Sequence, residues 1–349
     1  MPQKKFVFII LLLLLLITTI ASIALGAVSI TLGEMSSAIQ HLSEGTPSVS
    51  IHEGVFLQLR LPRVLLCMIV GAVLSVSGVL MQGLFRNPIV EPGLAGTSAG
   101  AAFGASIVFV LSSGLSPEFK AMTGPFLVPL FAFAGGMVAT FTVYSLARQS
   151  RMVPILTLLL IGMAVNAVGL SGTGFMSYLA RDPQARSITF WNLGTFSGAS
   201  WLQVGITGVV AIIVFCLSFR FAKQLNALLL GEEEAGYLGV DTDKLKRRML
   251  ILNTLMVSVA TAFVGVISFV GLIVPHILRS VVGSNNRILL PLSALAGAIL
   301  LLLADLLARL LLAPAEIPIG IITSLVGAPV FIILLKTSHL LSQREDSHA

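Results

Sequence analysis

The chain has 349 residues, of which 56% are hydrophobic and 10% are charged, and its mean hydropathy is +1.01. A typical soluble domain has about 25% charged residues, and 21 basic plus 15 acidic side chains cannot cover the surface of a soluble fold of this length. The net charge of +6 does not indicate nucleic-acid binding, because the basic residues are scattered between apolar runs. We therefore expect an all-α integral membrane protein that forms a single domain over residues 1–349. Its surroundings would be the lipid bilayer, and we expect no nucleic-acid partner.

The N-terminal segment predicts the first membrane span. Lys4 and Lys5 precede an apolar run from Phe6 to Val28. This run is long enough to cross a hydrocarbon core of ~30 Å as a helix, whereas the apolar part of a secretory signal usually has about 7 to 15 residues. A cleaved signal peptide remains the alternative interpretation.

Nine further apolar segments follow, which gives about ten transmembrane helices in all. The segment around Pro275 is too short to span at 1.5 Å per residue, so we expect a broken or tilted helix there. The nine segments lie at residues 64–84, 93–112, 124–147, 154–178, 201–221, 249–271, 273–284, 290–308 and 319–337.

The distribution of basic residues predicts the orientation. An even number of spans places both termini on one side, and a cytoplasmic N-terminus puts fifteen of the 21 basic residues in the cytoplasm. We therefore expect both termini to be cytoplasmic. In this topology Arg60, Arg63 and Arg309 lie on the outer side of the membrane.

Two connections between spans carry more information than the others. Residues 221–248 form the longest polar segment, broken at Gly231 and Gly239, and suit contact with a soluble partner, although a solvated connector explains the composition equally well. Residues 181–201 are rich in Gly, Ser and aromatic residues, which predicts a short helix that dips partly into the membrane or an ordinary aromatic-belt loop.

Ionisable and sulfur-containing residues inside the spans are few. Asp305 and Arg309 are four residues apart on one helix face, so a mutual ion pair is the economical explanation. Cys67 and Cys216 have no Cys or His at ligand spacing, so we expect buried packing residues and neither a metal site nor a disulfide.

We expect such a polytopic chain to be the membrane-spanning half of a transporter, but the chain shows no energy source of its own for uphill transport. No carboxylate is clearly central in a span, which argues against an ion-coupled carrier. The phosphate-binding sequence GxxxxGK[ST] is also missing from the chain, so a separate ATPase that docks on 221–248 would supply the energy. A passive channel remains an alternative interpretation of these observations.

Five ordered motifs resemble the FecCD-type permease subunits of ABC importers for ferric siderophores, haem and vitamin B12, known as type II importers. Their order and number make the resemblance specific, and it extends from about Gly26 to Lys336. The motifs are LRLPR (59–63), GLFRNPIVEPGLAG (83–96), LNALLLGEEEAGYLGV (225–240), GLIVPHILR (271–279) and LLLADLLARLLLAPAEIPIGIITSLVGAPVFI (301–332).

The resemblance implies an assembly in the bacterial cytoplasmic (inner) membrane. Two copies of this multi-pass chain would form a homodimer, with two ATPase subunits on the cytoplasmic side and an extracytoplasmic substrate-binding protein. The chain would not be an enzyme, and it would bind no cofactor or metal, because ATP and Mg belong to the partner ATPase. Transport would proceed by alternating access.

The resemblance also implies roles for particular residues. Arginines before the second span and near the end of the ninth would dock the binding protein. The cytoplasmic gate would follow the second span, and polar residues of the fifth span would line the pathway. The docking residues are Arg60, Arg63 and Arg309; the ATPase-coupling residues are Leu225, Gly231, Glu232, Ala235, Leu238 and Gly239; the gate residues are Asn87 and Ile89; and the pathway residues are Asn166, Ser171 and Thr173.

The substrate is less well defined by the sequence. The stretches ITFWNLGTFSGASW and LLLGEEEAGYLG look more like permeases for iron siderophores or haem than like the vitamin B12 type. We therefore expect a ferric chelate, with vitamin B12 as the alternative substrate and an ion-coupled secondary carrier as the alternative class.

Overall fold

The computed structural model describes residues 2–26, 29–44, 50–114, 116–148 and 155–346, and these residues form helices and connections with no strand. The all-α prediction is therefore confirmed. The α-helices are α1 (Pro2–Ala24), α2 (Leu32–Glu44), α3 (Ile51–Val55), α4 (Leu61–Phe85), α5 (Thr97–Leu111), α6 (Pro117–Ala147), α7 (Ile155–Leu179), α8 (Gln184–Asn192), α9 (Trp201–Arg220), α10 (Ala222–Leu228), α11 (Glu232–Tyr237), α12 (Thr242–Val264), α13 (Val270–Val282), α14 (Asn286–Leu310) and α15 (Ile319–Asp346).

Three short elements complete the fold. The π-helical turn η1 (Phe56–Arg60) joins α3 to α4, and the 3₁₀ turn η2 (Pro92–Ala95) precedes α5. A second 3₁₀ turn, η3 (Ser112–Gly114), follows α5.

Among the described residues, seven helical stretches are long and apolar enough to cross a membrane. Three shorter apolar helices accompany them, and the ten predicted segments fall on these ten helices. The count of ten crossings stays a prediction, because α5 and α13 are shorter than a membrane span and the third short apolar stretch is only the first part of α15. The seven stretches are Lys4–Ala24, Ile51–Phe85, Phe126–Ala147, Ile155–Leu179, Trp201–Arg220, Thr242–Val264 and Asn286–Leu310, and the shorter helices are Thr97–Leu111, Val270–Val282 and Ile319–Ile333.

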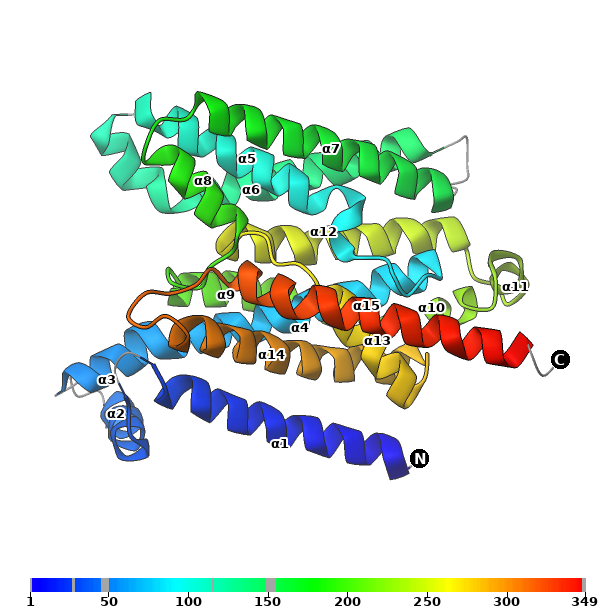
Figure 1. Ribbon diagram of the computed structural model, residues 1–349, viewed down its shortest axis with the longest axis horizontal. Coiled ribbons are helices and arrows are strands. Elements are labelled where there is room, and N and C mark those ends of the chain that lie inside the picture. The colour runs from blue at the N-terminus through cyan, green and yellow to red at the C-terminus, as the bar shows by residue number, and fades with distance from the viewer. Residues whose placement is uncertain (1, 27–28, 45–49, 115, 149–154, 347–349) are drawn as a thin grey trace.

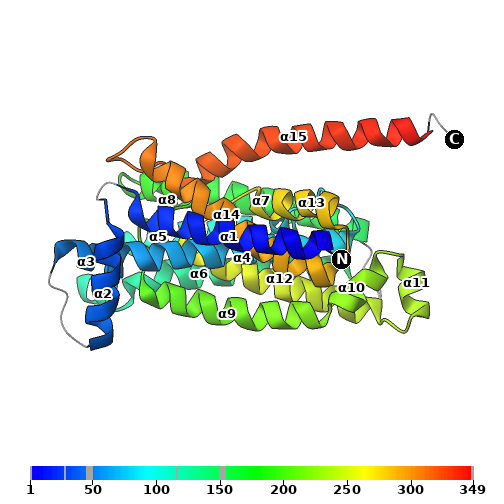
Figure 2. The ribbon, with the colours of Figure 1, turned by 90° about the horizontal axis from the view of Figure 1, so that it is seen from below.

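The long helices lie side by side in one bundle whose two ends differ (Figure 1). One end carries α2, α3 and the connection from α14 to α15, and we call it the α2 end. The other end carries α10, α11 and both ends of the chain, and we call it the α11 end. Seen from below, α15 runs along one side of the bundle and α9 along the opposite side (Figure 2).

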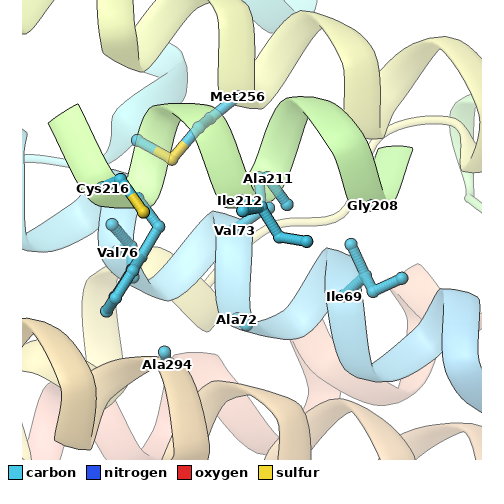
Figure 3. A pocket seen from close by; sticks show the side chains of 11 residues that line it. Ile69, Ala72, Val73, Val76, Gly208, Ala211, Ile212, Cys216, Met256 and Ala294 are labelled. Atoms are coloured by element: carbon cyan, nitrogen blue, oxygen red, sulfur yellow. The ribbon is translucent and has the colours of Figure 1, made fainter. Parts of the chain in front are cut away.

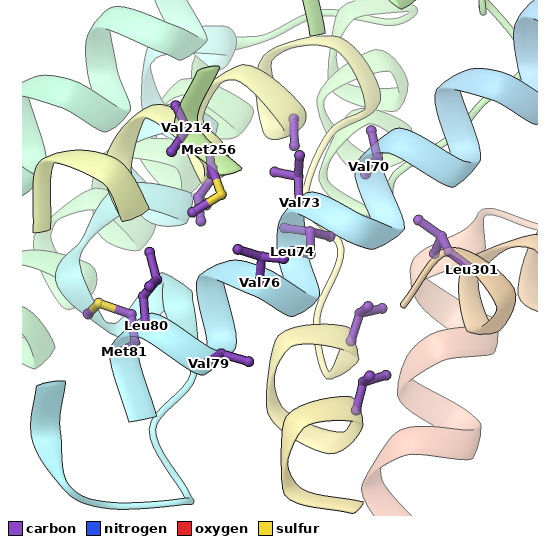
Figure 4. Packing of buried hydrophobic residues seen from close by; sticks show 14 of the residues in the cluster. Val70, Val73, Leu74, Val76, Val79, Leu80, Met81, Val214, Met256 and Leu301 are labelled. Atoms are coloured by element: carbon purple, nitrogen blue, oxygen red, sulfur yellow. The ribbon is translucent and has the colours of Figure 1, made fainter. Parts of the chain in front are cut away.

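Helix α4 is the centre of the hydrophobic core. Its residues Val73, Val76 and Leu80 are buried against Val214 of α9 and Met256 of α12 (Figure 4). A largely buried apolar helix requires neighbours on several sides, and α9, α12, α13 and α14 all pack against α4. The core is therefore organised around one central helix rather than between two layers.

Glycines allow the closest helix crossings on α4. A methyl group on Gly71 would overlap the backbone of Gly297 in α14, and one on Gly78 would overlap the backbone of Gly271 in α13. Close backbone approach through small residues is the usual way that helices associate in lipid, where there is no hydrophobic driving force between them. These two contacts fix α13 and α14 against α4.

Some predicted boundaries are wrong. The span predicted at 249–271 is α12, which begins earlier, at Thr242, and ends before Gly265 at φ +77°. Asp241 caps its start, because the Asp241 carboxylate accepts a hydrogen bond from the backbone N–H of Lys244 at 3.0 Å. Hydropathy missed this start, because basic residues occupy the first turns of the helix.

The expected short helix within 181–201 is present as α8, and α13 continues through Pro275 over only 13 residues.

Candidate transport pathway and partner surfaces

Two breaks in the helical backbone meet inside the bundle. One break covers residues 86–96 between α4 and α5, and the other covers residues 265–269 between α12 and α13. Both α5 and α13 therefore start partway along the bundle rather than at an end (Figure 1). In a membrane, backbone that is not helical survives only where protein groups satisfy it or where it lines a watery cavity.

Polar side chains supply those hydrogen bonds. The Glu91 carboxylate accepts from the backbone N–H of Phe269 at 3.1 Å, which joins the two breaks directly. The Asn253 amide on α12 donates to the carbonyl of Pro92 at 3.3 Å, and its oxygen accepts from the hydroxyl of Ser77 on α4. The Gln82 amide on α4 donates to the carbonyls of Gly271 and Leu272. A network of polar side chains thus replaces the helical hydrogen bonds that are lost at the breaks.

A cavity of about 510 Å³ opens where the breaks meet α5 and α7. Asn166 and Thr173 of α7, two of the three residues expected to line the pathway, lie in the wall of this cavity; the pathway role itself stays a prediction. The Asn166 amide lies 3.4 Å from the carbonyls of both Gly93 and Leu94. Ser171 is exposed and lies outside this lining, because α7 turns it onto a different face from Asn166 and Thr173. The remaining polar residues of the lining are Glu91, Ser98, Asn192 and Ser268.

The lining of this cavity is mixed. Five of its twelve residues carry hydroxyl or amide groups, Glu91 is the one carboxylate in it, and the other six are glycine or apolar residues. Among the described residues, no group of three or more His, Cys, Asp or Glu side chains is placed to hold a metal ion.

A second cavity, of about 330 Å³, is apolar and distinct from the first (Figure 3). It lies between α4 and α9, where Ile69 and Val73 face Ile212 and Cys216. Cys216 is exposed in the chain, so the expectation of a buried packing residue is wrong for Cys216 and confirmed for Cys67. The sequence could not distinguish the two, because an apolar run that faces lipid looks the same as one that faces a core.

The predicted gate residues lie in the turn that follows α4, at the α11 end. Arg86 takes a left-handed conformation at φ 49° and ends the helix. The Asn87 side chain then accepts a hydrogen bond from the backbone N–H of Ile89 at 2.9 Å, and Ile89 is 43% exposed. The turn is thus held by its own side chain and exposes Ile89 at the start of the first break.

The six predicted coupling residues divide into three pairs, of which one is buried and one is exposed. Leu225 on α10 and Ala235 on α11 are fully buried, and Leu225 packs against Gly83 near the end of α4. Leu238 is 64% exposed, and Gly239 continues the turn at φ +80° with open space around it. The buried pair anchors the segment, whereas the exposed turn is free for a partner.

The other two coupling residues stabilise the segment. Gly231 at φ +144° starts α11, and Glu232 forms an ion pair with Lys246 of α12 at 2.6 Å. The side chain of Lys246 is only 5% exposed, so this contact ties α11 firmly to the start of α12. Sequence reasoning missed Tyr237, which is 90% exposed beside Leu238; a large aromatic residue next to a helix break in a polar segment was the available signal.

The three predicted docking arginines come together at the α2 end around Asp305. Arg63 donates to Asp305 at 2.8 and 3.1 Å, and Arg309 donates to the same carboxylate at 3.0 Å, which confirms the predicted Asp305–Arg309 pair. The Arg60 guanidinium donates to the carbonyl of Leu25. Arg309 also donates to the Leu25 carbonyl at 3.0 Å, so both side chains hold the end of α1 against α4 and α14.

These arginines differ in exposure. The side chain of Arg309 is 6% exposed and that of Arg63 is 13% exposed, while Glu316, which Arg63 binds at 2.8 Å, is 39% exposed. The Arg63–Glu316 pair therefore forms the outer part of the cluster, and Asp305 with Arg309 forms its inner part.

Helix arrangement, polar cavity and partner surfaces together define a multi-pass membrane permease. The model of the FecCD transport family matches residues 14–337, and the chain belongs to this family of ABC importer permeases. The hemin transport system permease protein HmuU of Yersinia pestis is 42% identical over 294 residues, which cover 83% of this chain and 84% of that protein. The vitamin B12 import system permease protein BtuC of Vibrio vulnificus is 37% identical over 317 residues, which cover 91% of this chain and 92% of that protein.

A solved structure shares the fold over nearly the whole chain. It is described as an inward-facing conformation of an ABC transporter assigned to the metal-chelate type. The two chains are 33% identical, with a TM-score of 0.82 and coverage of 95% of this chain and 99% of that one. The described helices therefore have the arrangement of a known transporter.

Neutralising Asp305 should destabilise the fold strongly. Asp305→Asn leaves Arg63 and Arg309 without their shared buried carboxylate, and breaking such a pair costs about 3 to 5 kcal/mol. Glu316→Gln is the matched control, because its partly exposed pair with Arg63 should contribute less than about 1 kcal/mol. Thermal unfolding of the purified chain measures both variants, and equal losses would contradict the inner position of Asp305.

Proposed function

We propose that this chain is the membrane subunit of an ABC importer that moves a ferric chelate, a siderophore complex or haem, across the bacterial inner membrane. Two copies would form the pathway between them, with two ATPases bound at the α11 end and a substrate-binding protein at the α2 end. In this proposal the chain crosses the membrane ten times with both termini in the cytoplasm. Vitamin B12 has equal support as the substrate from the named relatives.

The observation that carries the proposal is a continuous set of contacts from the coupling segment to the cavity. Leu225 of α10 packs on Gly83, four residues before the Asn87 turn, and Glu91 beyond that turn lines the cavity. Movement of α10 by an ATPase would therefore act on the end of α4 and on the break that follows it. No covalent step is needed, because ATP has only to bind one arrangement of the assembly preferentially.

Docking of the binding protein would use the outer part of the arginine cluster. Arg63 is the docking arginine nearest the surface, whereas Arg60 and Arg309 hold α1 in place and support Arg63 from behind. Several exposed ion pairs of ~0 to 1 kcal/mol each would orient and steer the binding protein more than hold it.

Replacement of Arg63 should weaken capture of the binding protein. We expect Arg63→Gln to reduce affinity up to about fivefold, as for the loss of one exposed ion pair, and the effect should shrink at high salt. Arg186→Gln removes an exposed charge from α8 as the control. Surface plasmon resonance on the reconstituted complex, with thermal unfolding recorded in parallel, measures both variants. Unchanged capture by a stably folded Arg63→Gln variant would contradict the docking role.

Charging the exposed turn after α11 should uncouple the ATPase. Tyr237→Asp with Leu238→Asp removes two exposed side chains of the kind that anchor interfaces, so ATPase co-purification should fall at least tenfold while thermal stability stays unchanged. Glu233→Gln, also exposed on α11, is the control. Full co-purification and uptake by the double variant would place the ATPase contact elsewhere.

Uptake by the reconstituted assembly tests the proposed function itself. The chain, a candidate ATPase and a candidate binding protein in liposomes should accumulate labelled ferric siderophore or haem only when ATP is present. ATP-dependent uptake of vitamin B12 alone would keep the importer class and replace the substrate. Uptake driven by a proton or sodium gradient without ATP would overturn the proposal in favour of an ion-coupled carrier.

A further inference from the structure

A groove between α6 and α12 opens at the α11 end and has two chemically different parts. Its volume is about 380 Å³. Arg148, just after α6, and Arg247, in the second turn of α12, lie at its mouth. Deeper in, Phe141 of α6 faces Ile251 of α12 across an apolar floor. We call this feature the α6–α12 groove.

The two arginines at the mouth of the groove bind no other group among the described residues. Among the described residues neither guanidinium forms an ion pair or a hydrogen bond. The basic neighbours of Arg247 are engaged: Lys246 pairs with Glu232, and Arg248 lies 5.1 Å from the ring centre of Phe221. Arg247 is thus the member of this basic run that faces the groove without a partner.

The dimensions of the groove match one leaflet of a bilayer. From Arg148 down to Met137 it follows α6 for roughly 16 Å at 1.5 Å per residue. Half of a hydrocarbon core of ~30 Å is about the same depth. The charged mouth therefore lies at the level of lipid headgroups when the apolar floor lies among acyl chains.

We propose that the α6–α12 groove binds one anionic phospholipid of the leaflet at the α11 end. Arg148 and Arg247 hold the phosphate of the headgroup, and one acyl chain lies along Phe141 and Ile251. Guanidinium groups suit this role, because they bind phosphate oxygens in pairs and tolerate partial desolvation. Basic pockets between transmembrane helices are a known chemistry for anionic headgroups.

The position of the groove would let this lipid act on α12, which contacts both the first break and the coupling segment. Helix α12 carries Asn253, which holds the break at Pro92, and Lys246, which holds α11. The groove lies on α12 between these two contacts in sequence, at Arg247, Leu250 and Ile251. A lipid bound there would stabilise α12 against α6 at the place where the coupling segment joins the bundle.

Native mass spectrometry of the full-length chain, titrated with phosphatidylglycerol or phosphatidylcholine, tests the proposal. We expect Arg148→Gln with Arg247→Gln to lower the affinity for one phosphatidylglycerol about 30-fold, the factor expected for two basic residues at an anionic surface. Ile251→Trp, which fills the apolar floor, should remove the same lipid while both arginines remain. Binding of phosphatidylcholine should not depend on the arginines.

Matched variants control for charge and bulk. Arg181→Gln with Arg186→Gln removes two exposed charges near the α2 end, and Val209→Trp adds bulk to an exposed position of α9. Both should bind phosphatidylglycerol as the unmodified chain does. A second basic groove, lined by Lys4, Lys5 and Arg287, stays intact in every variant.

Three outcomes would overturn the proposal. The first is unchanged phosphatidylglycerol binding by the double arginine variant. The second is displacement of the lipid by inorganic phosphate together with no effect of Ile251→Trp, which would indicate a simple anion site. The third is loss of ATPase co-purification with lipid binding intact, which would assign Arg148 and Arg247 to the partner interface.

Discussion

The structure depends on one constraint: backbone groups released by a broken helix inside a membrane must find partners within the protein. The breaks at 86–96 and 265–269 meet that requirement through Glu91 on Phe269 and Asn253 on Pro92. Two of the polar side chains beside the first break also line the cavity: Glu91, and Asn166 with its amide near the carbonyls of Gly93 and Leu94. The shortness of α5 and α13 follows from the same breaks. A fold built only of uninterrupted spans would need neither the network nor the cavity.

The arginines at the two ends of the bundle differ in whether they have partners within the protein. At the α2 end, Asp305 is shared by Arg63 and Arg309, so positive charge is neutralised inside the protein and ties three helices together. At the α11 end, Arg148 and Arg247 remain without an internal partner among the described residues. This asymmetry agrees with the orientation that the basic residues predict. The arginines at the α2 end are thus held in a fixed geometry beneath the proposed docking surface, whereas Arg148 and Arg247 at the α11 end face their surroundings.

The sequence was informative wherever hydropathy or a motif defined the feature. Apolar segments located the helices, and spacing along one helix predicted the pair of Asp305 and Arg309. The sequence failed where the answer depends on the rotation of a helix or on its neighbours. Ser171 and Thr173 are two residues apart but lie on different faces of α7, and Cys216 looked as buried as Cys67. The start of α12 was missed for the same reason, because its basic first turns are stabilised by contacts such as Lys246 with Glu232.

The central claim is that the cavity at the two breaks is part of the transport pathway that two copies of the chain would form between them. Ser98, which lines it, can be replaced by Ser98→Cys in a background with Cys67→Ala and Cys216→Ser. A membrane-impermeant thiol reagent is then applied from either side of the reconstituted assembly, with and without ATP. The account predicts that the new thiol reacts from one side in the resting state and from the other side when ATP is bound. A thiol that reacts from neither side in both states, or from the same side throughout, would contradict it.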